Sequence, residues 1–258
     1  MPERDGFAPG TPSWVDLSTP EVDAAEAFYG ELFGWTTLAP GSVEETGGYK
    51  FFLSDGRRVA GVGPLMDSQQ PVVWSTYFAT DDVDALAGRV TEFGGSSLFE
   101  PMDIMDAGRM GFFAHPAGGT FGAWQAGNHT GAELVNEPVS LAWNTLITPH
   151  PEDAAAFFGL IFGLSTETQV LGGEDFVVLT LGEQGVAGLM SPPPGMPDGV
   201  PAFWGVSFAV TDADATAALA VERGGSVLME PMQREGVGRI ATVADPWGAT
   251  FSVAALSS

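Results

Sequence analysis

The chain has 258 residues, 45% of them hydrophobic, and a formal net charge of −24 from 33 acidic and 9 basic residues. A surface with this much negative charge repels nucleic-acid phosphates and anionic lipids. We therefore expect neither nucleic acid nor a membrane as a partner. The absence of cysteine excludes disulfides, thiolate metal sites and a cysteine nucleophile. No apolar run reaches the roughly 20 residues that span a bilayer, and the start of the chain lacks a secretory signal pattern, so a cytoplasmic location is expected.

The first recognisable element is a strand followed by a short helix, within residues 14–35. Alternating residues predict the strand, and Thr19 with Pro20 predicts the helix start, with Thr as the cap and Pro at the first helical position. Apolar residues at 22, 25, 29 and 32 recur at helical spacing, and Gly34 predicts the helix end. The same pattern recurs at residues 143–164.

The rest of the chain is also duplicated. Strands are predicted at 49–53 and 59–62, and their counterparts at 176–179 and 186–189. A further strand and helix at 75–95 recurs at 205–225, and each copy is followed by more strands. The segment 127–136 has no counterpart and is predicted to be a linker.

The chain therefore divides into two halves, residues 12–126 and 137–256, each with two modules of one strand, one helix and three strands. Strands that follow a single helix, without strict alternation, favour a mixed sheet. We predict an α+β fold in which four βαβββ modules form two cupped half-barrels of mixed sheet.

Three features resemble the vicinal oxygen chelate superfamily, which contains glyoxalases, bleomycin-resistance proteins and extradiol dioxygenases. They are the tandem modules, the helix that ends in residues 28–35, and the turn Asp-Pro-Trp-Gly at 245–248. The resemblance extends over roughly residues 12–256. The chain is also similar to two-domain actinobacterial members with an Asp-Ala-Gly-Arg-Met loop, here 106–110, many of which are labelled hydroxylase or glyoxalase-like.

The resemblance implies a divalent metal held at three strand positions on each cupped face. These positions are Trp14, Ser75 and Gly122 in the first half, and Trp143, Gly205 and Ser252 in the second. Transition metals prefer imidazole or carboxylate ligands, which none of these residues supplies. We therefore expect neither a metal nor another cofactor.

Strand alternation predicts which side chains line the two cups. The predicted ligand-binding set is Trp14, Ser75, Tyr77 and Trp124 in the first half and Trp143, Thr145, Ser207 and Ser252 in the second. Aromatic walls with a few hydroxyl groups are typical of small-molecule pockets, and the rings can stack on a planar ligand or face a cation. In the alternative interpretation the tryptophans simply fill the cups as core.

Two candidate catalytic residues stand out, Asp16 and His115. Asp16 is a carboxylate on a predicted apolar wall, so it either pairs with Arg57, Arg58 or Arg109 or remains available to a ligand. If it is unpaired, burial raises its pKa and suits it to act as a general base. His115 precedes Pro and Gly, so it is either a turn residue at the rim or a proton-transfer group.

Other polar residues receive structural interpretations. Arg109 and Arg239 occupy matching positions and are expected to pair with Glu100 and Glu230. His129 in the linker and His150 at the start of a helix are expected to be solvated.

Two functions fit the sequence. The first is a metal-independent small-molecule-binding protein of the glyoxalase/bleomycin-resistance type, which sequesters or detoxifies an aromatic or cationic metabolite. The alternative is a lyase, isomerase or hydroxylase of the same superfamily that acts on a small carbonyl or polyketide-like substrate with Asp16 as general base. In both cases the expected partner is a small molecule and the chain is a monomer or a weak homodimer.

Overall fold

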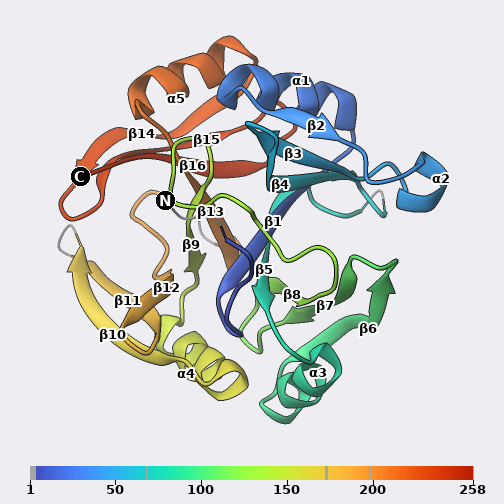
Figure 1. Ribbon diagram of the computed structural model, residues 1–258. Helices are drawn as coiled ribbons and strands as arrows, with labels where there is room; N and C mark the ends of the chain where they lie inside the picture. Colours follow the sequence, from blue (N-terminus) through green and yellow to red (C-terminus); the bar gives the residue numbers. More distant parts are fainter. Residues whose placement is uncertain (1–3, 68, 172–173, 198, 258) are drawn as a thin grey trace.

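A computed structural model describes residues 4–67, 69–171, 174–197 and 199–257 (Figure 1). The first half contains β1 (Pro12–Thr19), α1 (Val22–Phe33), β2 (Thr36–Leu38), α2 (Val43–Thr46), β3 (Lys50–Ser54), β4 (Arg57–Pro64), β5 (Val73–Ala79), α3 (Val83–Glu92), β6 (Ser96–Ile104), β7 (Gly108–Ala114) and β8 (Thr120–Ala126). The second half contains β9 (Leu141–Ile147), α4 (Pro151–Phe162), β10 (Ser165–Leu171), β11 (Glu174–Leu181), β12 (Gln184–Met190), β13 (Phe203–Ala209), α5 (Ala213–Glu222), β14 (Ser226–Arg234), β15 (Gly238–Ala244) and β16 (Thr250–Leu256).

Each half forms one eight-stranded mixed sheet, in the order β2-β3-β4-β1-β5-β8-β7-β6 and β10-β11-β12-β9-β13-β16-β15-β14. The two modules of a sheet meet at an antiparallel pair, β1 with β5 and β9 with β13. Within each module the first and last strands pair in parallel, as β1 does with β4 and β5 with β8. This topology confirms the predicted α+β fold of four βαβββ modules in two cupped sheets.

Helix α1 has the predicted end but not the predicted start. Its N-cap is Glu21, which makes no side-chain capping bond, so the helix begins two residues after Pro20. The Thr19 hydroxyl instead accepts a hydrogen bond from the Glu21 amide at 3.4 Å. Gly34 ends the helix with φ of 73°, a left-handed conformation that suits glycine.

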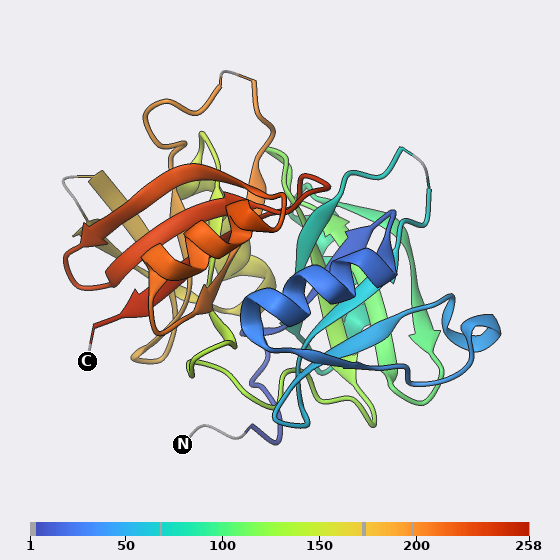
Figure 2. The ribbon, with the colours of Figure 1, turned by 90° about the horizontal axis from the view of Figure 1, so that it is seen from above.

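The two sheets pack against each other through the faces that carry the helices. Each of the two hydrophobic cores between them contains residues from both halves, and we call these the crosswise cores. Figures 1 and 2 show α1 beside α5, and Figure 1 shows α3 beside α4. Phe33 of α1 packs against Phe208 of β13 with ring centroids 5.4 Å apart. In the other core Phe78 of β5 stacks on Phe158 of α4 at 5.5 Å. Alternate residues of the central strands point away from these cores and onto the cupped faces.

The N-terminal arm and the linker are packed onto the first sheet. The Gly10 amide donates to the Ala79 carbonyl at 2.9 Å, and the Arg4 amide donates to the Glu133 carbonyl at 3.2 Å. The Ala132 amide donates to the Ser13 carbonyl at 2.8 Å, and Ala132, Leu134 and Val135 are buried. The connection between the halves is therefore part of the folded structure.

Candidate functional site

Asp16 lies at the centre of the first cup. On β1 it is in register with Gly61 of β4 and Ser75 of β5, and its side chain is largely buried. The Tyr49 hydroxyl donates to Asp16 Oδ2 at 3.5 Å and accepts from Trp14 Nε1 at 2.9 Å. Trp14, Tyr49 and Asp16 thus form a hydrogen-bonded line on the cupped face.

Burial raises the pKa of the Asp16 carboxyl to about 7, although hydrogen bonds from Tyr77, Tyr49 and Ser75 lower it. Two of the three expected arginine partners bind other carboxylates. Arg58 pairs with Glu133, whereas Arg109 pairs with Asp84 and Asp103. Hydroxyl groups surround Asp16, and a carboxyl with this pKa can accept or release a proton near neutral pH.

Two glycines make room for tyrosine rings on the floor of the first cup. A Cβ on Gly61 would lie 1.8 Å from the Tyr49 hydroxyl oxygen, and a Cβ on Gly122 would lie 2.2 Å from the Tyr77 ring. The Tyr77 ring thus covers Gly122, one of the positions at which the resemblance implies a chelating side chain.

The donor set does not fit a divalent metal. The Asp16 carboxylate lies at the centre of the first cup, and its lone pairs receive hydroxyl hydrogen bonds. Across the described parts of the chain, no group of three or more His, Asp or Glu side chains is placed to hold a metal ion. A transition metal needs several imidazole or carboxylate ligands, and these residues do not supply them.

His129 is buried in the first cup, contrary to its predicted solvation. Its ring centroid lies 4.4 Å from that of Trp14, 5.1 Å from that of Phe51 and 5.5 Å from that of Trp124. Burial, reinforced by the nearby Arg58, lowers the pKa of His129 to about 4. The linker carries no strand or helix pattern, so the sequence gives no signal that it packs here.

The second cup is more open. Ser207 of β13 is in register with Trp143 of β9 and Ser252 of β16, and Thr145 is in register with Gly188 and Gly205. The side chains of Trp143, Thr145, Ser207 and Ser252 are all half-buried, whereas Trp14 in the first cup is only 4% exposed. Aromatic Tyr77 and Trp124 correspond to Ser207 and Ala254 here, so the second cup lacks two of the rings that fill the first.

His115 lies on the opposite side of the first sheet from Asp16. It follows β7, and its ring centroid is 4.8 Å from that of Phe157 and 6.2 Å from that of Phe158, both on α4. His115 is a turn residue, as one of the two interpretations predicted, because its Nδ1 accepts from the Ala117 amide at 3.0 Å and its carbonyl accepts from the Gly118 amide at 2.9 Å. Only 5% of it is exposed, so it is not a solvent-exposed rim residue. Its counterpart Asp245 accepts a hydrogen bond from Tyr29 at 3.1 Å in the equivalent place of the other core.

The predicted pairing of the two matching arginines with Glu100 and Glu230 is wrong. Arg109 binds Asp84 in the first turn of α3, and Arg239 binds Asp214 in the first turn of α5. Each pair ties a helix to the sheet beneath it, so the arginines have the structural role that their positions suggested.

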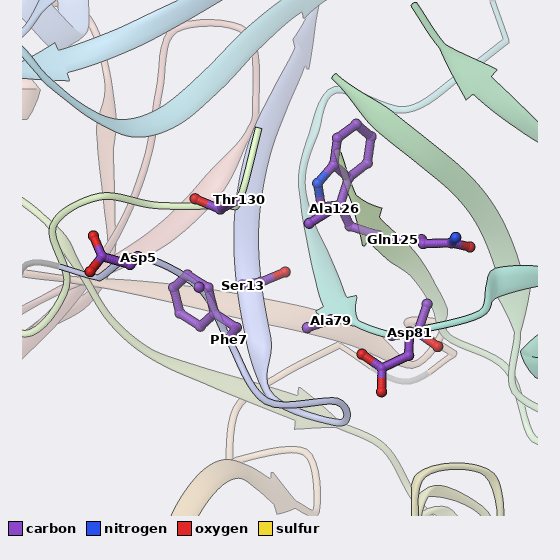
Figure 3. Close-up of a pocket in the computed structure, with 11 residues that line it drawn as sticks. Asp5, Phe7, Ser13, Ala79, Asp81, Gln125, Ala126 and Thr130 are labelled. Carbon is purple, nitrogen blue, oxygen red and sulfur yellow. The ribbon is translucent and has the colours of Figure 1, made fainter. Parts of the chain in front are cut away.

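A pocket of about 290 Å³ lies beside the first cup, between the N-terminal arm, the ends of β5 and β8 and the linker. Figure 3 shows Asp5 and Asp81 on opposite sides of the labelled group, with Phe7, Ser13 and Ala79 between them. Trp124 and Thr130 also line the pocket, which therefore adjoins the residues that hold His129.

Paired βαβββ modules in cupped sheets define the class of protein, and the sequence assigns the family. The Glyoxalase/Bleomycin resistance protein/Dioxygenase superfamily matches residues 11–122 and 140–253, and the chain belongs to it. It is 44% identical to a putative glyoxylase, CFP32, of Mycobacterium tuberculosis, over 98% of this chain and 97% of that protein. It is 42% identical to the anthracycline biosynthesis protein DnrV of Streptomyces peucetius, over 97% and 94% of the respective chains.

Solved structures share the fold at low sequence identity. The Mn(II)-bound glyoxalase from Novosphingobium aromaticivorans superposes with a TM-score of 0.65 and 17% identity, over 96% of this chain and 82% of that one. The 2,3-dioxygenase LapB from Pseudomonas sp. KL28 superposes with a TM-score of 0.66 and 13% identity, over 96% and 92%. Among the described residues, no helix has the length and apolarity needed to cross a membrane.

Proposed function

We propose that this protein binds a small, flat aromatic molecule on the cupped face of its second half, without a metal. The observation that carries the proposal is the half-buried Trp143, in register with Ser207 and near the hydroxyls of Thr145 and Ser252. An indole face offers stacking area, and hydroxyl groups can donate to or accept from the oxygens of a ligand.

Two further observations support this class of ligand. A relative that is 42% identical is named an anthracycline biosynthesis protein, which points to a planar polyketide-like molecule. The net charge of −24 favours a neutral or cationic ligand in the second cup, because none of Trp143, Thr145, Ser207 and Ser252 carries a positive charge that would offset it. Sequestration or detoxification of such a metabolite in the cytoplasm, by a monomer or weak homodimer, is the corresponding role.

Tryptophan fluorescence quenching tests the proposal, with 1,8-dihydroxyanthraquinone as a neutral probe and proflavine as a cationic one. We expect Trp143→Ala to weaken binding about tenfold, equivalent to about 1.4 kcal/mol. Trp247→Phe is the control, because Trp247 contacts Phe28 of α1 and lies outside both cups.

Dialysis against EDTA, followed by elemental analysis, tests the metal-independent part. We expect unchanged affinity. Stoichiometric metal together with lost binding would contradict the proposal.

A second candidate rests on Asp16. Its buried carboxyl, with a pKa raised to about 7, suits a general base in a lyase, isomerase or hydroxylase that acts on a small carbonyl or polyketide-like substrate. In that case Asp16→Asn abolishes turnover of the ligand but leaves its binding intact. Equal turnover by the variant and the original protein would exclude this role.

A further inference from the structure

Residues 127–131 form a strap across the first cup. At one side, the Gly127 and His129 amides donate to the Ala107 carbonyl at 2.9 and 3.0 Å, in the turn between β6 and β7. At the other side, the chain is fixed to β1 and β4 just after the strap, where the Ala132 amide donates to Ser13 and the Glu133 amide to Arg58, both at 2.8 Å. The strap therefore joins the outer part of the first sheet to its centre.

The His129 side chain occupies the space that an aromatic ligand of this cup would take. Trp14 meets the imidazole edge-on, Phe51 lies tilted against it, and Trp124 adds a third aromatic wall. Trp124 Nε1 also donates to the His129 carbonyl at 2.7 Å. His129 is thus held by the contacts of its ring with three aromatic side chains and by hydrogen bonds of both its backbone amide and its backbone carbonyl.

One of the two nitrogens of this imidazole has a hydrogen-bond partner among the described residues and the other has none. Nδ1 lies 3.3 Å from Arg58 Nη1, which can only donate, so Nδ1 accepts and the proton of the neutral ring is on Nε2. Nε2 is buried and has no hydrogen-bond partner among the described residues. A buried N–H without an acceptor destabilises the state that contains it, which favours replacement of His129 by a better-matched group.

We propose that the first cup is a latent binding site for a single-ring aromatic molecule that carries an acceptor oxygen, such as a benzoate or a phenolate, and that His129 fills it until the strap is displaced. The ring of such a ligand packs against Trp14 and Phe51. Its oxygen accepts hydrogen bonds from Arg58 Nη1 and from Trp124 Nε1. The Trp124 N–H is free to donate to the ligand once the His129 carbonyl has moved away. This site is separate from the one proposed around Trp143.

Two features allow the strap to move. The pocket of about 290 Å³ is lined by Thr130 and Trp124, so there is space directly beside the strap. Gly131 has φ of 109°, and a Cβ there would lie 2.6 Å from the Ser13 carbonyl oxygen. Gly131→Ala should therefore loosen the strap without removing His129.

Isothermal titration calorimetry with benzoate tests the proposal on the full chain at about 0.15 M salt, with benzylamine as the cationic comparison. We expect His129→Ala to bind benzoate at least tenfold more tightly than the original protein, and benzylamine to gain nothing. His150→Ala is the matched control, because His150 is exposed at the N-cap of α4. Equal benzoate affinity in His129→Ala and the original protein would overturn the proposal.

Hydrogen exchange on the original protein is a second test, and its result does not depend on whether His129→Ala folds correctly. We expect benzoate to accelerate exchange of the Gly127 and His129 amides in the original protein, and Gly131→Ala to bind benzoate more tightly. Binding without faster exchange at these amides would contradict strap displacement. Trp143→Ala should leave all these results unchanged. The proposal for the first cup and the proposal for the second cup can therefore be refuted independently of each other.

Discussion

Asp16 and its counterpart Thr145 show how a single position distinguishes the two cups. Asp16 is surrounded by Tyr49 and Tyr77, and burial raises the pKa of its carboxyl to about 7. Burial also raises the pKa of each of these tyrosines well above its ordinary value, so both remain neutral hydroxyl donors. The first cup therefore concentrates a titratable group where the second has a half-buried threonine.

The Asp16 carboxyl should make stability fall with rising pH. Its ordinary pKa is 3.8 and its folded pKa is about 7, so between these values the folded chain holds a proton that the unfolded chain has lost. The folded state is penalised progressively through this window, and by about 4 kcal/mol above it. Asp16→Asn should therefore be more stable than the original protein at pH 8 and nearly equal to it at pH 4.

Urea unfolding at several pH values measures this difference. Glu44→Gln serves as the control, because it removes a carboxyl that is exposed on α2. A pH-independent difference between Asp16→Asn and the original protein would show that folding does not raise the pKa of Asp16.

At the scale of elements, a hydrogen bond links the first helix to the second half. Tyr29 of α1 donates to Asp245 Oδ2 at 3.1 Å and accepts from Trp74 Nε1 at 3.0 Å. The equivalent place in the other core holds Phe158 and His115, stacked with their ring planes 11° apart. The two crosswise cores thus have equivalent backbone positions, but one has a hydrogen bond where the other has stacked rings.

Tyr29→Phe should destabilise the protein by about 1–3 kcal/mol, because it leaves the buried Asp245 without one of its donors. Burial already raises the pKa of the Asp245 carboxyl, and loss of the Tyr29 hydrogen bond should raise it further. Denaturant unfolding of Tyr29→Phe, Asp245→Asn and the double variant gives the coupling energy. Strict additivity of the two changes would show that this hydrogen bond contributes nothing.

The features that could be predicted from the sequence are those that depend on the local spacing of apolar residues. Repeats at the period of strands and helices gave the modules, and Gly34 ended α1 as expected. Strand parity also separates Trp14 from Val15, which lies fully buried beneath the sheet. The helix start was placed too early because Thr19 forms a turn hydrogen bond rather than a cap.

Long-range contacts could not be read in this way. One partner of Arg109 is Asp84, 25 residues away on a different element, and no pattern favours it over Glu100. His129 lies in a segment without periodicity, so its insertion among three aromatic rings is visible only in the folded chain. The asymmetry of the cups follows from these contacts.

At the scale of the molecule, the crosswise cores make the halves dependent on each other. One core joins α1 to β13, β16 and α5, and the other joins β5, α3 and β8 to α4. Neither half can bury its helix-bearing face alone, since that face is completed by the other half.

Residues 1–136 and 137–258, produced separately, should each lack a native near-ultraviolet circular dichroism spectrum, whereas co-expression should yield a 1:1 complex that has it. Size-exclusion chromatography with near-ultraviolet circular dichroism measures both outcomes. A separated half with a sharp cooperative unfolding transition would refute the mutual dependence.

The net charge of −24 also acts on the whole molecule. Repulsion among acidic groups opposes the compact state, and salt screens it over a distance of about 8–10 Å at moderate ionic strength. The thermal midpoint should therefore rise between about 0.02 and 0.5 M sodium chloride. A falling midpoint would show that favourable ion pairs such as Arg109–Asp84 outweigh the repulsion.

The crosswise cores also bear on how the two copies can diverge. A substitution on a helix-bearing face must satisfy neighbours from both copies, so the copies constrain each other there. In the helix-bearing cores the copies differ in matched pairs, since Tyr29 and Asp245 correspond to Phe158 and His115. On the outward faces single positions differ without such a partner, as Tyr77 and Ser207 do, and Trp124 and Ala254. After the internal duplication each copy could therefore acquire its own chemistry on its cupped face, although each still needs the other copy to complete its hydrophobic core.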